Sequence, residues 1–548
     1  MRGGWKALLL LAALIPIFGS AEDFPLSELK AGQRGFAITA GPGNHLEHFP
    51  VEVLALQEND RLGFPLALIR AEGDFINRSG GIAAGMSGSP VYLQREGHNA
   101  LLGAIAYTFP NSDHRLALVT PIGAMRGVLD RRVTDPFGGA NLEGLDAPVP
   151  VATPLLFTGI GTREISFLRA LLRESPLEFL PIQAGGVAEA EERFHLEPGS
   201  PISVQLVRGD VTVAAVGTVT TIEGGEVLAF GHPLLGTGRV SFVLSPASVL
   251  HIVPSDRVPF KLVNSGTTVL GSIVQDRPAA LAGEVGTPPD LLPVTLVLSG
   301  GRGTVTTHFE IVHDERFYGP LLAAATQQVL DKTWNQISGG TSEVAWEITF
   351  ETGDRLTVLE QTSDPDDLAV ATAKLAAEPL LILGRNPFEA PDLEHISISV
   401  RYEEARRVAE IVHVRAETPT VEPGEAVVVF VRLQPFREEA RVEEVRITLP
   451  KELKGEVELT FRAGEDDEDN EGEPEVDDEV LSFGELLVAM RNNVQASELV
   501  VEVEIGDEPL RLERIPFPFL LEGRETLRIE VQEVDTNGEE ELPMGEEQ

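Results

Sequence analysis

The sequence predicts a mainly β protein, with two small β-barrels, a short helical region and a C-terminal β-sandwich. Short runs of alternating apolar and polar residues, interrupted by glycine, proline and asparagine, recur along most of the chain. This pattern is typical of strands joined by turns. The runs form two blocks of about 100 residues each, which suits a pair of small barrels packed against each other. Helical spacing is confined to a few segments.

Changes in composition divide the 548-residue chain into predicted segments. Stretches rich in proline and glycine mark linkers, and acidic runs mark solvated loops and tails. In chain order, the segments are a signal peptide (1–21), a first β unit (30–135), a linker with a short helix (136–197), a second β unit (198–303), a mixed α/β region (304–395), a β-sandwich with an acidic loop (396–535) and an acidic tail (536–548).

The first β unit contains runs that predict strands, followed by a closing segment that predicts a helix. The strands are expected at Pro50–Gln57, Leu62–Arg70, Val91–Gln94, Leu101–Thr108 and Leu116–Thr120. The closing helix is expected at Pro121–Leu129. Proline and glycine are then dense over Asp135–Pro154, which predicts the linker. Within the linker, Glu164–Arg173 has the spacing of a short helix.

The second β unit contains two recognisable hairpins. Ile202–Arg208 and Val211–Thr218 flank the turn Gly209-Asp210. Thr218–Ile222 and Val227–Phe230 flank a turn that contains Gly224 and Gly225. Short turns rich in glycine and aspartate between β-branched runs are the strongest local signal for a hairpin.

The chain beyond residue 303 changes character. Apolar residues at helical spacing predict helices at Tyr318–Gln336 and Asp366–Ala377. Alternation then returns, and Val427–Leu433 and Val442–Leu449 are the clearest strands of the predicted sandwich. Within that region, eleven of the fifteen residues from Glu465 to Glu479 are acidic, which predicts a solvated loop.

The N-terminus has the order of a secretory signal peptide. Arg2 and Lys6 precede an apolar run over Ala7–Phe18, and small residues follow it up to Ala21. A basic start, a short apolar middle and small residues before the cleavage point predict export, with cleavage after Ala21. The run is short for a bilayer span, which takes about 20 residues, although a retained anchor is the alternative interpretation. The mature chain is therefore expected to be secreted, or located in the periplasm or cell envelope, with no integral membrane segment.

Composition and charge exclude several classes of function. The chain has no cysteine, so disulfides, thiolate metal sites and a thiol nucleophile are excluded. Its formal net charge of −43 argues against nucleic-acid binding, because phosphates require a basic surface. The sequence has no metal-ligand spacing and no phosphate-binding loop, and Gly301–Gly303 fits a turn. No cofactor and no metal are therefore expected.

The segment Gly85-Met86-Ser87-Gly88-Ser89-Pro90 is built like the nucleophile loop of a serine peptidase. Such a serine lies on a tight turn that presents its hydroxyl while backbone N–H groups face the developing oxyanion. The glycines on either side of Ser87 permit the dihedral angles that this turn requires. A strand, a turn and a second strand follow, as in chymotrypsin-like peptidases, where a Gly-Asp-Ser-Gly-Gly-Pro loop precedes a hairpin. The alternative is an ordinary Gly/Ser turn between strands.

His232 is the candidate base. A nucleophilic serine needs a base, and histidine, with an unperturbed pKa of about 6.5, is the usual one. Among the eleven histidines, His232 is distinguished by its position where an apolar run, Leu228–Phe230, ends at a Gly-His-Pro turn. A ring that emerges from the end of a rigid strand is well placed to act as a fixed base. The alternative is a structural histidine at a turn.

Together these segments resemble the SpoIVB peptidase family, the serine peptidases typified by the sporulation signalling protease. The resemblance covers about residues 30–130 and 200–290, about a third of the chain. The residues that carry it are Gly80–Pro90, Leu102-Gly103-Ala104, Gly231-His232, and the lead-in segments Gly32–Phe36 and Pro50–Leu54.

The resemblance implies that Ser87 is the nucleophile, that His232 is its base, and that the N–H groups of Gly85 and Ser87 form the oxyanion hole. Two departures stand out. In the family the Gly-His segment precedes the serine segment, whereas here it follows. Triads are recognised by geometry and not by chain order, so a permuted order of the two barrels can still build one site. The chain also lacks a PDZ-like domain ahead of the serine region.

The acid of the site is left open by the sequence. The family's acid lies about fifteen residues before the serine, and that position corresponds to Glu72, with Asp74 close by. Either could hold the tautomer of the imidazole. Asp276 and Asp210 are rivals, and each of the four could equally be a solvated turn carboxylate.

Two functions follow as hypotheses. The first is an exported serine endopeptidase that hydrolyses peptide bonds with the Ser87–His232 pair, acting on exposed loops of other envelope proteins or on itself. The second is a catalytically inactive envelope protein that keeps the peptidase-like barrels as a binding or scaffold module, because fold does not imply function.

Overall fold

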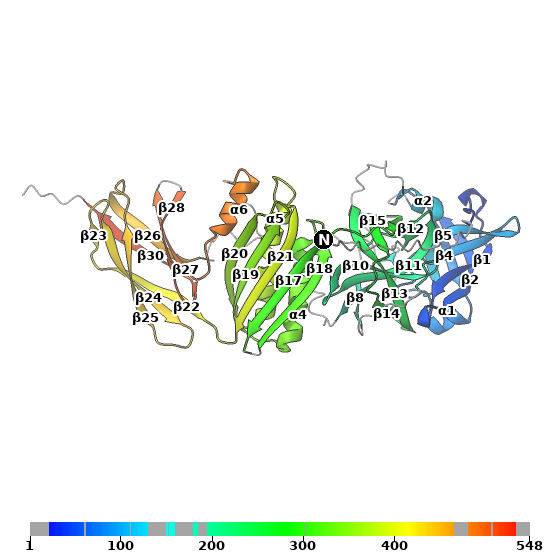
Figure 1. Ribbon diagram of the computed structural model, residues 1–548, viewed down its shortest axis with the longest axis horizontal. Coiled ribbons are helices and arrows are strands. Elements are labelled where there is room, and N and C mark those ends of the chain that lie inside the picture. The colour runs from blue at the N-terminus through cyan, green and yellow to red at the C-terminus, as the bar shows by residue number, and fades with distance from the viewer. Residues whose placement is uncertain are drawn as a thin grey trace, which may run out of the picture. The chain divides into compact units, whose positions relative to one another are not determined.

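The computed structural model of the chain describes residues 21–59, 62–109, 111–129, 149–151, 153–158, 179–184, 194–301, 303–464, 480–505 and 508–532 (Figure 1). The predicted signal peptide up to residue 20, most of the linker with its helix at Glu164–Arg173, the acidic loop and the acidic tail lie outside these residues. The chain forms two compact units, one built from 1–156, 174–204 and 215–288, and the other from 157–173, 205–214 and 289–548.

The first unit begins with a closed six-stranded antiparallel barrel. Its strands are β1 (Arg34–Ala40), β2 (Leu46–Gln57), β3 (Leu66–Ala71), β4 (Pro90–Arg95), β5 (His98–Thr108) and β6 (Leu116–Pro121). They are ordered β4-β1-β2-β3-β6-β5, and β5 pairs with β4 to close the barrel. A 3-10 turn at Leu26–Glu28 precedes β1, and a second one at Pro42–Asn44 joins β1 to β2. The helix α1 (Asp74–Ser79) lies between β3 and β4, and α2 (Ile122–Arg126) follows β6. The short β7 (Val149–Pro150) pairs with β5.

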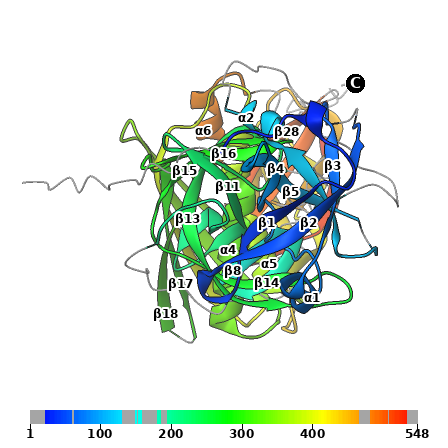
Figure 2. The same cartoon turned by 90° about the vertical axis from the view of Figure 1, so that its right-hand side faces the viewer.

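A second closed barrel follows, most of it in the same unit. Its strands are β10 (Pro201–Gly209), β11 (Val213–Glu223), β12 (Glu226–Ala229), β13 (Gly238–Val253), β15 (Gly271–Arg277) and β16 (Ala280–Val285). They are ordered β10-β13-β15-β16-β12-β11, and β10 also pairs with β11. β14 (Phe260–Ser265) pairs with β13, while β8 (Thr153–Thr158) and β9 (Phe179–Ala184) continue from β11. Figure 2 views the two barrels from the side on which β1 and β2 lie.

The second unit contains an α/β layer. Its sheet is ordered β20-β19-β21-β17-β18, and the helices α4 and α5 pack on each other and on the sheet. The Trp346 indole donates to the Ala376 carbonyl at 3.0 Å, which joins β19 to α5. The elements are β17 (Leu291–Gly300), β18 (Gly303–Val312), α4 (Tyr318–Trp334), β19 (Gly340–Phe350), β20 (Arg355–Asp364), α5 (Leu368–Arg385) and β21 (Leu393–Glu403).

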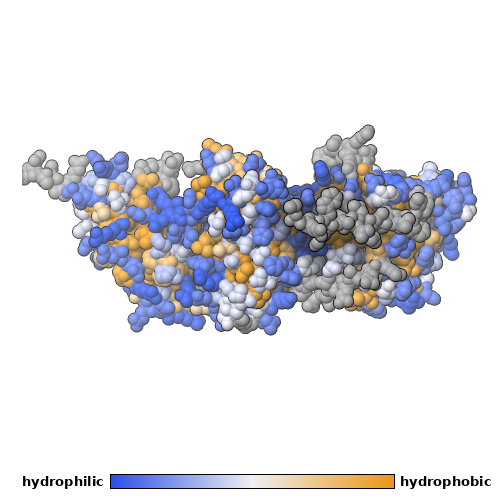
Figure 3. Space-filling model, in the orientation of Figure 1, coloured by the Kyte–Doolittle hydropathy of each residue, from blue (hydrophilic) through white to orange (hydrophobic). Residues whose placement is uncertain are grey.

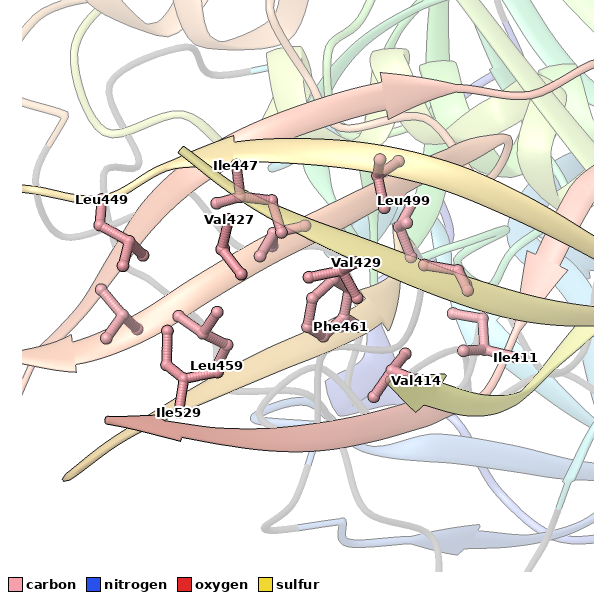
Figure 4. Close-up of a cluster of buried hydrophobic side chains, with 14 of the residues drawn as sticks. Ile411, Val414, Val427, Val429, Ile447, Leu449, Leu459, Phe461, Leu499 and Ile529 are labelled. Atoms are coloured by element: carbon pink, nitrogen blue, oxygen red, sulfur yellow. The ribbon is translucent and has the colours of Figure 1, made fainter. Parts of the chain in front are cut away.

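The C-terminal part of this unit is a two-sheet sandwich. One sheet is ordered β25-β24-β22-β29 and the other β23-β30-β26-β27-β28. Figure 4 shows the apolar side chains that meet between them, with Phe461 and Val429 near the centre. The elements are β22 (Val408–Ala416), β23 (Thr420–Val421), β24 (Ala426–Pro435), β25 (Arg441–Thr448), β26 (Gly455–Ala463), α6 (Phe483–Arg491), β27 (Glu498–Ile505), β28 (Glu508–Pro516), β29 (Leu520–Glu522) and β30 (Arg524–Val531).

The mainly β fold class predicted from the sequence is confirmed, with two closed barrels, a helical region and a sandwich. The segment boundaries expected at residues 303 and 396 fall inside the α/β sheet, because β17 pairs with β18 on one side and with β21 on the other. Hydrophilic side chains are spread over the face shown in Figure 3, in keeping with the high content of charged residues. No helix in the described part of the chain is long and apolar enough to span a bilayer.

Candidate active site

The Ser87 loop lies between α1 and β4 and is held by backbone hydrogen bonds on both sides. Ahead of the serine, the Ala84 N–H donates to Pro259 O at 2.7 Å, and the Lys261 N–H donates to Ala84 O at 3.0 Å. Behind it, the Gly88 N–H donates to Ile105 O at 2.8 Å. The loop therefore connects to β5 of its own barrel and to β14, which pairs with β13 of the second barrel.

Gly88 allows the loop to reach the second barrel. Its φ of +91° is a conformation that L side chains rarely adopt. A Cβ atom built at this position would lie 1.9 Å from Thr218 O and 2.5 Å from Phe230 N. The Thr218 N–H donates to Ser87 O at 2.8 Å across the same contact. Residues beside the serine therefore touch both β11 and the end of β12, which leads to the histidine.

Two threonines of β11 hold the carbonyl groups of the loop. The Thr218 hydroxyl donates to Gly85 O at 3.0 Å, and the Thr220 hydroxyl donates to Gly88 O at 2.7 Å. The role of these threonines could not be predicted from the sequence, since threonines are common in strands. Among the described residues, neither the Gly85 N–H nor the Ser87 N–H donates a hydrogen bond. These two amides are the ones that the family resemblance predicts to form an oxyanion hole.

His232 follows a sharp reversal at the end of β12. Phe230 and Gly231 both have positive φ, +68° and +73°. The Thr120 hydroxyl donates to Gly231 O at 2.6 Å. A Cβ atom at Gly231 would lie 3.1 Å from the Cβ atoms of Ala104 and Ala106. The histidine segment thus packs on β5 next to Ile105, the residue whose carbonyl anchors the Ser87 loop, so the structure brings the two segments together.

The imidazole of His232 is fully buried. Its neighbours include the rings of Tyr107 and Phe230, with centroids at 6.3 and 5.8 Å. Nδ1 donates to Pro233 O at 2.7 Å, because a carbonyl oxygen can only accept. In the neutral ring, Nε2 is then the free acceptor. Burial lowers the pKa of His232 to about 4, although the bond to Pro233 opposes this shift.

Ser87 and His232 both keep an unused polar atom inside the protein. Both residues have no solvent-exposed surface, and neither Ser87 Oγ nor His232 Nε2 has a hydrogen-bond partner. The two atoms therefore do not bond to each other in this conformation. A buried polar atom without a partner costs about 1–3 kcal/mol, so two such atoms on adjoining segments call for a functional explanation. Chemically they are complementary, a hydroxyl donor and a nitrogen acceptor.

The carboxylates considered from the sequence fall into different environments. Glu72 is half-buried at the end of β3, and Asp74 is exposed at the start of α1. Neither hydrogen-bonds to His232, because Nδ1 is occupied by Pro233 O. Asp210 is exposed in the second unit, and its carboxylate accepts the His308 N–H at 2.9 Å. Asp276 is fully buried in the same unit as His232.

Lys261 is a further buried titratable group near the Ser87 loop. Its side chain has no exposed surface, and Nζ donates to Thr39 Oγ1 at 2.8 Å. Burial lowers the pKa of this amine to about 7. Burial of Lys261 could not be predicted from the sequence, because a lysine in an alternating strand normally faces solvent.

The described residues contain no group of three or more histidine and carboxylate side chains arranged to hold a metal ion. The groups that the described residues place at this site are a hydroxyl, an imidazole and two free amides. Comparison with protein-family models, characterised proteins and solved structures found no match to this chain. The resemblance to the SpoIVB peptidases consequently rests on the quoted segments alone.

Proposed function

We propose that this chain is an exported serine endopeptidase of the SpoIVB type, in which Ser87 attacks the peptide bond and His232 is its base. The observation that carries the proposal is the presence of two buried, unpartnered atoms, Ser87 Oγ and His232 Nε2, on segments that pack on the same strand. The free N–H groups of Gly85 and Ser87 beside them support it.

In this mechanism His232 Nε2 accepts the Ser87 proton as Oγ bonds to the substrate carbonyl carbon. The oxyanion that forms accepts hydrogen bonds from the Gly85 and Ser87 amides. The imidazolium then gives its proton to the leaving amine, and the peptide bond breaks. Water attacks the acyl-enzyme in the second half, with His232 again as base, and releases the carboxylate product and Ser87.

Substrate access requires a rearrangement, because Ser87 and His232 have no exposed surface. The substrates would be protein or peptide segments that are themselves extended, or a segment of this same chain. The signal-peptide pattern places the activity outside the cytoplasm, in the cell envelope or the medium.

A fluorophosphonate probe tests the proposal on the full mature chain. We expect covalent labelling of the wild type, none of Ser87→Ala, and labelling of His232→Gln slowed by about 100- to 10,000-fold, the usual contribution of a general base. Ser89→Ala is the matched control, because Ser89 Oγ is also buried and unpartnered two residues away. It should label like the wild type. Labelling that survives Ser87→Ala would overturn the assignment.

The complete burial of Ser87 and the missing Ser87–His232 hydrogen bond favour one second candidate, a catalytically inactive binding or scaffold module of the envelope. The same experiment separates the two. If neither the wild type nor any variant is labelled while a control peptidase reacts, the binding module is the better description.

A further inference from the structure

Asp276 is a buried carboxylate that the mechanism above leaves unused. It lies on β15, between Gly238 of β13 and Leu281 of β16, and its side chain has no exposed surface. No ion pair of the described residues includes it. An unpaired buried charge is costly unless hydrogen bonds replace its hydration. The hydrogen-bond partners of the Asp276 carboxylate therefore indicate its role.

Those partners are the backbone amides directly after His232. Oδ1 accepts the Leu234 N–H at 2.7 Å, and Oδ2 accepts the Leu235 and Gly236 N–H groups at 2.6 and 2.9 Å. Burial raises the pKa of Asp276, and these amides oppose the shift. Every partner of both oxygens is a donor, whereas a protonated carboxyl would need an acceptor for its own hydrogen. The hydrogen bonds therefore fit the ionised form.

The peptide group between Pro233 and Leu234 links this carboxylate to the imidazole. Its N–H donates to Asp276 Oδ1 at 2.7 Å, and its C=O accepts from His232 Nδ1, also at 2.7 Å. One planar peptide unit is thus hydrogen-bonded to the acid on one side and to the base on the other. Hydrogen bonds in such a chain polarise one another in a low-dielectric interior.

We propose that Asp276 is the acid of this site and acts on His232 through the Pro233–Leu234 peptide group rather than by direct contact. Asp276 is a positioning residue in this arrangement. It fixes the carbonyl that holds the imidazole in the Nδ1–H tautomer, leaving Nε2 free to accept a proton. Its charge, transmitted through the polarised peptide group, also stabilises the imidazolium that forms when His232 takes the Ser87 proton. The catalytic part of this inference rests on the proposed peptidase function, whereas the tautomer part does not.

Among the described residues, no carboxylate hydrogen-bonds to the ring. Tyr107 of β5 packs against it, and burial raises the pKa of that phenol. Phe230 of β12 is apolar. Nδ1 donates its hydrogen bond to Pro233 O.

The tautomer can be measured in the wild-type protein, without any variant of Asp276. With 15N-labelled histidine, the His232 resonances are assigned by their loss in His232→Gln. We expect Nδ1 to carry the proton and Nε2 to have the shift of an unprotonated nitrogen at pH 7. A ring protonated on Nε2 would overturn the relay, and this result does not depend on enzymatic activity.

Asp276→Asn then tests the acid itself. The amide nitrogen of asparagine would face backbone donors, so we expect a mixed tautomer and probe labelling slowed by about 10- to 100-fold, as for other residues that orient a functional ligand. Labelling needs the neutral form of His232, so its rate falls below the pH at which the ring is protonated. In Asp276→Asn that pH should be lower than in the wild type, because a negative charge that favours the imidazolium is lost. A merely loosened loop would hydrate His232 and move that pH up, toward 6.5.

Asp210→Asn is the matched control, because Asp210 also accepts a backbone N–H but lies in the second unit. It should leave the His232 tautomer and the labelling rate unchanged. If Asp276→Asn is folded and keeps the wild-type tautomer and rate, the relay is wrong. If the wild type shows the expected tautomer but is never labelled, the relay stands and the peptidase function fails.

Discussion

Burial of His232 favours the neutral form of its ring, so the stability of the folded chain depends on pH. Burial lowers its folded-state pKa from 6.5 to about 4. Between these two pH values, the unfolded chain binds a proton at this residue that the folded chain does not. The contribution of His232 to stability is therefore complete above pH 6.5 and is lost as the pH falls to 4.

We predict that acidification from pH 7 to 4 removes about 3 kcal/mol of stability through His232 alone. His232→Gln should lose less stability over this range, measured as the free energy of unfolding in urea. The exposed His251 provides the control, and His251→Gln should follow the wild type. Equal pH dependence in the wild type and His232→Gln would contradict the burial argument.

Ser87 and His232 could be proposed as site residues from the sequence because both lie beside glycines that the local backbone requires, and local requirements are visible in a sequence. The sequence left the acid open and did not distinguish Asp276 from its rivals, since the amides that Asp276 contacts lie 40 to 42 residues earlier in the chain. Only the pairing of β15 with β13 and β16 brings Asp276 to them. Glu72 and Asp74 were suggested by their distance from Ser87 in the chain, and that distance does not determine which side chain reaches a ring.

At the scale of elements, hairpins were predicted well because they are local. The turns at Gly209-Asp210 and Gly224-Gly225 join β10 to β11 and β11 to β12, as expected. The helix expected over Asp366–Ala377 is longer, ending at Arg385, and it passes through Pro379. Tertiary packing of its apolar face overrides the usual effect of an internal proline. Pairings between distant strands, such as β17 with β21, leave no local signal.

The contact between the Ser87 loop and β11 can be tested with a pair of glycines. Gly88 and Gly97 have similar positive φ, +91° and +86°, but only Gly88 faces a neighbouring backbone, since nothing lies within 4 Å of a Cβ atom at Gly97. We predict that Gly88→Ala destabilises the protein by about 1–3 kcal/mol more than Gly97→Ala, because overpacking adds to the shared backbone strain. Thermal unfolding measures the difference.

The two glycine variants are also expected to differ in their rate of labelling. Gly88→Ala should slow fluorophosphonate labelling at temperatures where the variant is still folded, while Gly97→Ala should label at the wild-type rate. A Gly88→Ala variant as stable as Gly97→Ala would mean that the loop and β11 are not packed as described.

At the scale of the whole molecule, the candidate site combines residues that are far apart in the sequence, whereas the sandwich core comes from one continuous segment. Ser87, His232 and Asp276 all belong to the first unit, although Asp276 follows Ser87 by 189 positions in the sequence. The sandwich core, in contrast, draws on residues 409 to 531 alone. A core formed from one continuous segment can fold without the rest of the chain.

We therefore predict that a fragment of residues 406–532 folds alone and unfolds cooperatively in urea. Within it, Phe461 is fully buried at the centre of the core, whereas Phe436 is 40% exposed. Phe461→Ala should cost about 3–5 kcal/mol, the usual range for a buried aromatic residue. Phe436→Ala should cost at most about 1 kcal/mol, as an exposed site. A fragment without a cooperative transition would show that the sandwich depends on the rest of its unit.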